Sequence, residues 1–177
     1  DPSGDVVERL VDFTKSHGID DIAELWSHSP AKSLPGALWR LYLLPLMIHD
    51  DPITAALLYE RGRTALDSAD PVLAGAPTPA GPDEMKELID VILRGLFTGD
   101  FGVALDRAAA FARVEATGST HLADDYEATE PERASTFTTR ALRLSDYAGD
   151  LIACAALWRR ASRTWPGARS LGLPLSR

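Results

Sequence analysis

The sequence predicts an all-α protein of about eight helices, arranged in antiparallel hairpins as a compact helical bundle or a short helical-hairpin array. Three observations lead to this fold class. Apolar residues recur at positions i, i+3, i+4 and i+7 along most of the chain. Typical helix starts, a polar capping residue followed by proline, precede several of these stripes. Alternation with period two is never sustained, so no strand is expected.

The first 50 residues are expected to hold three helices. A short helix over 5–16 ends before Gly18, and Asp20 caps a second short one. Ser33 caps the third, with proline in its first turn. Because the third helix is apolar on most sides, we expect it at the centre of the fold, kinked or broken at Pro45.

The middle of the chain contains the clearest helical pattern. A fourth helix begins at Asp51, and the proline-rich stretch 70–82 is expected to be an internal hinge or a strap. The stripe from Met85 to Phe97 then follows helical spacing throughout, and a sixth helix over 101–112 has a second clean stripe. These two helices are predicted to form an antiparallel hairpin.

The last third of the chain is expected to hold two more helices. The polar stretch 117–129 is predicted to be a loop. The segment Thr129-Glu130-Pro131-Glu132 fits a capping box that starts a seventh helix, ending near Leu144. An eighth helix begins near Asp146 and stops at Pro166, and 166–177 is expected to be a flexible tail. The whole of 1–177 is therefore read as one helical domain.

Charge is unevenly distributed along the sequence. The net charge is −8, but residues 1–132 carry 10 Lys/Arg and 24 Asp/Glu, whereas residues 133–177 carry 8 Arg and 2 Asp. An acidic body makes nucleic acid an unlikely partner, and it favours docking of the basic terminal segment on the protein itself. With a single cysteine and no apolar run long enough to span a membrane, we expect a cytoplasmic protein without disulfides or membrane segments.

Three expected second helices can be aligned, starting at Asp51, Asp100 and Asp146. The segment Gly99-Asp100-Phe101-Gly102-Val103-Ala104-Leu105 resembles the start of the second helix in tetratricopeptide repeats, a family that stacks helical hairpins to bind peptides. The spacings of 49 and 46 residues depart from that family's repeat of about 34. The chain as a whole resembles an uncharacterised all-helical family typical of high-GC actinobacteria, and that resemblance implies no particular activity.

One candidate ligand site lies on the third helix. Trp39 and Tyr42 share a helix face, and Arg40 is displaced from Trp39 by about 100°. A buried arginine needs a carboxylate or a ligand anion, so Arg40 is either paired within the protein or an anion clamp. His49 lies near the end of the same helix and precedes two aspartates, of which Asp51 is expected to cap the next helix.

A second candidate site is the basic face of the eighth helix, formed by Arg159, Arg160 and Arg163. These arginines could dock on the acidic body, on a protein partner or on phosphates. Cys154 lies on an apolar stripe and is expected to be a small buried hydrophobe.

No signature of a catalytic, phosphate-binding or metal-binding site accompanies these candidates, and no cofactor or metal is predicted. We therefore expect a non-enzymatic helical protein-interaction or regulatory domain that binds a protein partner or forms a homodimer. Two alternatives stay open. One is a small-ligand-binding or catalytic domain with a pocket near Trp39, Arg40 and Tyr42. The other is an accessory nucleic-acid-binding protein that uses the basic terminal helix.

Overall fold

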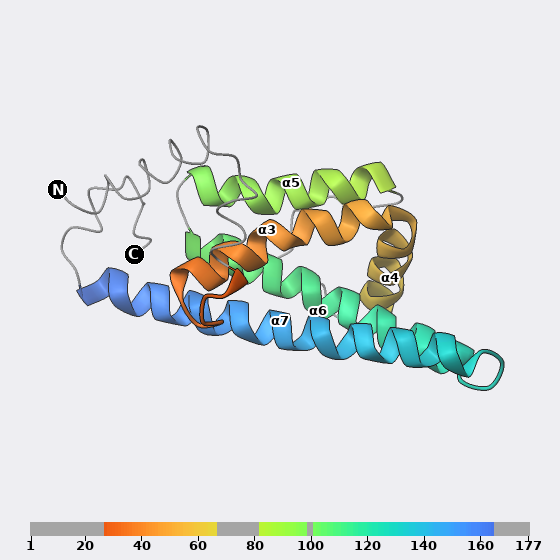
Figure 1. The fold of residues 1–177 in the computed structure, drawn as a ribbon. Coiled ribbons are helices and arrows are strands. Elements are labelled where there is room, and N and C mark those ends of the chain that lie inside the picture. Colours follow the sequence, from red (N-terminus) through yellow and green to blue (C-terminus); the bar gives the residue numbers. More distant parts are fainter. Residues whose placement is uncertain (1–26, 67–81, 99–100, 165–177) are drawn as a thin grey trace.

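The protein is all-helical in the part that the structure, a computed structural model, describes: residues 27–66, 82–98 and 101–164. Those residues form no strand, as the sequence predicts. The five helices are α3 (Leu34–Asp50), α4 (Pro52–Ala65), α5 (Pro82–Thr98), α6 (Phe101–Tyr126) and α7 (Pro131–Thr164) (Figure 1).

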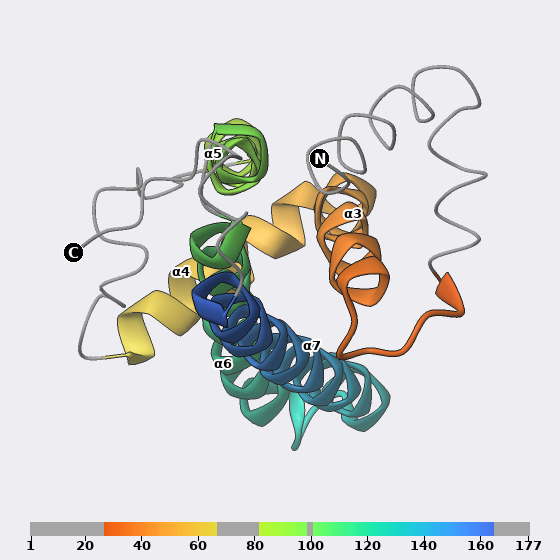
Figure 2. The same ribbon diagram turned by 90° about the vertical axis from the view of Figure 1, so that its left-hand side faces the viewer.

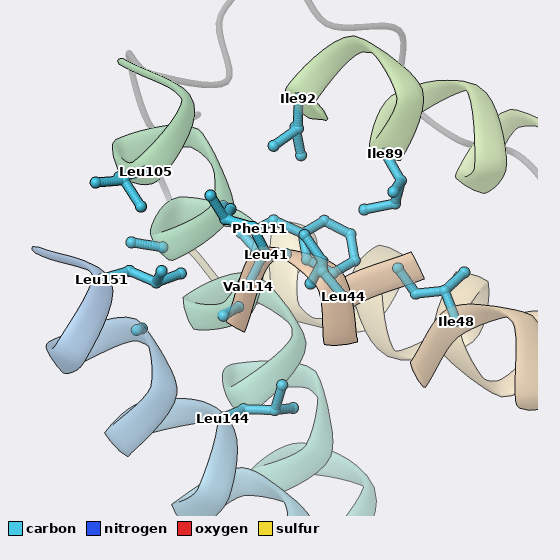
Figure 3. Packing of buried hydrophobic residues seen from close by; sticks show 14 of the residues in the cluster. Leu41, Leu44, Ile48, Ile89, Ile92, Leu105, Phe111, Val114, Leu144 and Leu151 are labelled. Atoms are coloured by element: carbon cyan, nitrogen blue, oxygen red, sulfur yellow. The ribbon is translucent and has the colours of Figure 1, made fainter. Parts of the chain in front are cut away.

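A long antiparallel hairpin of α6 and α7 is the base of the fold (Figure 1). Helices α3 and α5 both lie on one side of this hairpin, and α4 crosses α6 obliquely (Figure 2). The inner faces of all five helices meet in one apolar core, where Phe111 of α6 lies among Leu41 and Leu44 of α3 (Figure 3). The ring of Phe111 also stacks on Tyr59 of α4, with 5.4 Å between centroids.

The expectation that the third helix lies at the centre is wrong, because α6 occupies that place. Of the 26 residues of α6, 15 are buried, and its contacts with α7 and α4 are the most extensive in the fold. Only five of the 17 residues of α3 are buried. A break at Pro45 is also wrong, since α3 runs through it to Asp50. Buried residues on both sides of the proline, Leu44 and Ile48, hold the helix on the core.

The expected boundary between a seventh and an eighth helix does not exist. Helix α7 is continuous over 34 residues, so Asp146 lies inside it and the third of the three aligned helix starts is not a start. The buried stripe explains this continuity: Leu144, Ala148 and Leu151 follow helical spacing straight across the expected boundary. The described residues therefore hold five helices rather than the six expected there, and the total of about eight is not supported.

The predicted loop 117–129 is mostly helix, because α6 continues to Tyr126. Its hydroxyl groups bond to carbonyls four residues earlier, as the Ser119 hydroxyl does to the Glu115 carbonyl at 2.8 Å. The hydroxyl groups of this stretch thus have hydrogen-bond partners inside the helix, so its polar composition does not require a loop. Leu122 and Ala123 also pack against Phe137 of α7.

The crossing of α4 and α6 is a close contact between two backbones. A Cβ atom on Gly62 would lie 1.9 Å from the carbonyl oxygen of Val114, and one on Gly118 would lie 1.8 Å from that of Leu58. Any side chain at either glycine would force the helices apart. The two glycines therefore fix how closely α4 approaches α6.

Several predictions fall on residues outside the described ranges. These are the helix over 5–16, the short helix that begins at Asp20, the hinge or strap 70–82 except Pro82, and the tail 166–177. Among the described residues, no single helix is long and apolar enough to cross a membrane. Helices α3 and α4 satisfy the length and composition together, but they are bent by 106° where they meet.

Candidate functional site

Arg40 is held at the contact between α3 and α7. Its Nη2 donates to Asp150 Oδ2 at 2.6 Å, and its Nη1 donates to the carbonyl of Gly36 at 3.2 Å. The hydroxyl of Tyr147 donates to the Arg40 carbonyl at 2.7 Å, and burial raises the pKa of Tyr147 despite the opposing charge of Arg40. The guanidinium thus joins two helices, and the anion that it needs comes from the protein itself.

The other predicted ligand residues of α3 lie on a different face from Arg40. The rings of Trp39 and Tyr42 are stacked with 5.6 Å between their centroids. Leu46 follows at helical spacing and is 44% exposed, and His49 is exposed at the end of the helix. We call Trp39, Tyr42, Leu46 and His49 the outer face of α3. It is a mostly apolar helix surface on which Trp39 and Tyr42 are half-buried.

The basic residues near the end of α7 divide into two groups. Arg159 forms an ion pair with Asp106 of α6 and also donates to the carbonyl of Gly102. The Nε of Arg160 donates to the carbonyl of Ala156, one turn earlier in its own helix. Arg160 and Arg163 are exposed. The acidic body therefore holds Arg159, in agreement with the intramolecular docking that the charge distribution favours.

Cys154 is buried, as its place on an apolar stripe predicts. Its Sγ lies 3.3 Å from the carbonyl oxygen of Ala31, and burial raises the pKa of the thiol. A nucleophilic cysteine needs the opposite shift, because the thiolate is the reactive form. The environment of Cys154 is that of a packing residue.

The acidic residues at the junction of α3 and α4 have a structural role. The Asp51 carboxylate accepts a hydrogen bond from the Thr54 amide at 3.0 Å, and hydrogen bonds to Thr54 lower its pKa. Asp51 is thus the predicted N-cap of α4. No group of three or more His, Cys, Asp or Glu side chains is placed to hold a metal ion within the described ranges.

A buried ion pair between α6 and α7 was not expected from the sequence. Glu115 is 2% exposed, and its Oε2 lies 3.5 Å from Nη2 of Arg140. The signal for its burial is the spacing from Ala108 and Phe111, since position 115 is seven and four residues further along the same stripe. The stripe that the sequence predicts for this helix ends at Ala112, shortly before the predicted loop at 117.

No family model, curated protein or solved structure matches this chain. The arrangement of its own side chains is therefore the basis for assigning a function. The charged candidates Arg40 and Arg159 have partners within the chain. The outer face of α3 carries aromatic and leucine side chains, of which Trp39 and Tyr42 are half-buried and Leu46 is exposed.

Proposed function

We propose that this protein is a non-enzymatic helical interaction domain that associates with a second copy of itself through the outer face of α3. The single observation that carries the proposal is the place of α3 in the fold. It is the most apolar of the five described helices in composition, yet most of its residues are not buried. A helix that is apolar all round normally has partners on all sides.

The side chains of this face suit protein recognition. Trp39, Tyr42 and Leu46 are spaced three and four residues apart, so they form one row along the helix. Aromatic residues supply a large contact area at a small cost in conformational entropy and are enriched at the centre of protein interfaces. The same row on a second copy is self-complementary, as a twofold interface requires.

Sedimentation velocity at increasing protein concentration tests the proposal. The wild-type chain is expected to form a dimer, and Leu46→Asp is expected to shift it to monomer by placing a charge in the interface. Leu142→Asp is the matched control, because Leu142 is 64% exposed on α7 and the same change there leaves the outer face of α3 intact. A wild-type chain that stays monomeric, or equal loss of the dimer in both variants, overturns the proposal.

A further inference from the structure

Glu115 and Arg140 form an incomplete ion pair where α6 packs against α7. Among the Asp, Glu, Lys, Arg and His side chains of the described residues, only that of Glu115 is buried. One contact of 3.5 Å joins it to Arg140, while Glu115 Oε1 and Arg140 Nε have no hydrogen-bond partner and are shielded from solvent. These two atoms are the ones that a bidentate arginine–carboxylate pair would join.

The pair borders the apolar core. Glu115 follows Val114 and Arg140 precedes Leu144 by one turn, and both apolar residues belong to the core (Figure 3). Burial raises the pKa of Glu115 to about 8, and the opposing effect of Arg140 is smaller. Arg140 is the only described charged group that acts on the Glu115 carboxyl, although α4, α5 and α7 all pack on α6.

Arg140 also acts on a second carboxylate. Asp51 is exposed at the N-cap of α4, and the positive charge of Arg140 contributes to lowering its pKa, after the hydrogen bonds to Thr54. Arg140 itself is 26% exposed, so its guanidinium lies at the edge of the core, with one carboxylate inside and another at the surface.

We propose that Arg140 is the moving part of a proton-controlled contact between α6 and α7. When Glu115 is ionised, Arg140 turns inward and completes the bidentate pair. When the Glu115 carboxylate takes up one proton from solvent, the pair loses its attraction and Arg140 turns toward Asp51 and water. Proton uptake at a single buried carboxyl thus sets whether the guanidinium ties α7 to α6 or turns outward to solvent.

Nitrogen-15 NMR of the arginine side chains tests this proposal on the intact chain. The Arg140 Nε–H signal is expected to change with pH with a midpoint near 8, in step with the carbon-13 signal of the Glu115 carboxyl. Arg143, exposed one turn further along α7, is the matched control and should not change. In Glu115→Gln the Arg140 transition should vanish, whereas Asp51→Asn should keep the midpoint and alter only the low-pH signal.

Two results would overturn the proposal. One is an Arg140 signal that is constant across the titration in the wild-type chain. The other is an Arg140 transition that persists unchanged in Glu115→Gln. If Glu115→Gln does not fold, the wild-type titration still decides, because unequal midpoints for the Glu115 carboxyl and the Arg140 Nε–H would show that the two groups are not coupled.

Discussion

Helices α3 and α6 are both rich in apolar residues, but they differ in how much of their surface the rest of the fold buries. Helix α6 is enclosed by α4, α5 and α7, and even a glutamate and a serine on it are buried. Helix α3 buries one face and leaves Leu46 44% exposed beside two aromatic rings. Since apolar composition alone does not determine which helix is central, the apolar side chains of α3 that lie outside the core need another explanation, and the proposed protein interface supplies one.

The largest expected loss of stability comes from forcing α4 and α6 apart. Gly118→Val should abolish cooperative folding, because the new side chain would meet the backbone of Leu58, which no rotamer change can relieve. The cost should exceed the roughly 1–3 kcal/mol typical of overpacking. Gly149→Ala is the matched control: a Cβ there meets nothing within 4 Å, so we expect a gain of about 0.5–1 kcal/mol. Urea unfolding followed by circular dichroism measures both, and a well-folded Gly118→Val variant would contradict the account of the crossing.

A smaller effect should come from the buried carboxyl of α6. The pKa of Glu115 is about 8 in the folded protein against an ordinary value of 4.5, so the folded state holds a proton between these values that the unfolded state has lost. The free energy of unfolding should therefore fall as the pH rises through this interval, by on the order of 5 kcal/mol, and Glu115 should contribute no further change above it.

The comparison with Glu115→Gln isolates this contribution, because all other titrating groups are shared between the two proteins. Urea unfolding at a series of pH values should give a slope in the wild-type chain that is greatly reduced in the variant. Asp51 has the opposite effect on the pH dependence of the free energy of unfolding, because folding lowers its pKa. The stability that Asp51 contributes is present above its ordinary pKa and is lost as the pH falls through its pKa in the folded protein. Parallel curves for wild type and Glu115→Gln would show that the carboxyl is ionised in both states.

The contact between α3 and α7 should tolerate the loss of one hydrogen bond. Tyr147→Phe removes the donor to the Arg40 carbonyl without leaving a cavity, and we expect a loss of about 1 kcal/mol. Thermal unfolding measures this change. A loss as large as that expected for Gly118→Val would mean that α3 is held as firmly as α6, and the contrast between the two helices would disappear.

The smallest effect on stability is expected on the outer face of α3. Leu46→Asp should change the free energy of unfolding by no more than about 0.5 kcal/mol, because the side chain is exposed in the isolated chain. Chemical denaturation at low protein concentration checks this value. A much larger loss of the free energy of unfolding would show that Leu46 belongs to the core, and it would contradict an interface on this face.

The sequence predicts the local structure of this protein better than its packing. The caps at Ser33 and Asp51 and the burial of Cys154 follow from residue type and spacing, and the structure confirms all three. The continuity of α7 and the length of α6 depend on contacts between helices, so local signals at Asp146 and the polar stretch 117–129 gave the wrong boundaries. Ion pairs between residues far apart in the chain could not be predicted from the sequence either. Nothing near Arg40 in the chain indicates that its partner lies 110 residues away.

The candidate site illustrates the same limit. One interpretation of the sequence groups Trp39, Tyr42 and His49 with Arg40 in a ligand pocket. The structure places these three residues on the outer face of α3, while Arg40 pairs with Asp150 of α7. Spacing along one helix shows which residues share a face, but only the other helices determine which face is covered.

Site-specific photocrosslinking tests most directly whether a protein covers the outer face of α3. A photoreactive amino acid replaces Leu46 in one preparation and Leu142 in another, both positions being exposed in the isolated chain. The account predicts a covalent adduct of twice the mass of the chain from position 46 and none from position 142. Equal adducts from both positions, or none from position 46 at concentrations where the chain sediments as a dimer, would contradict it.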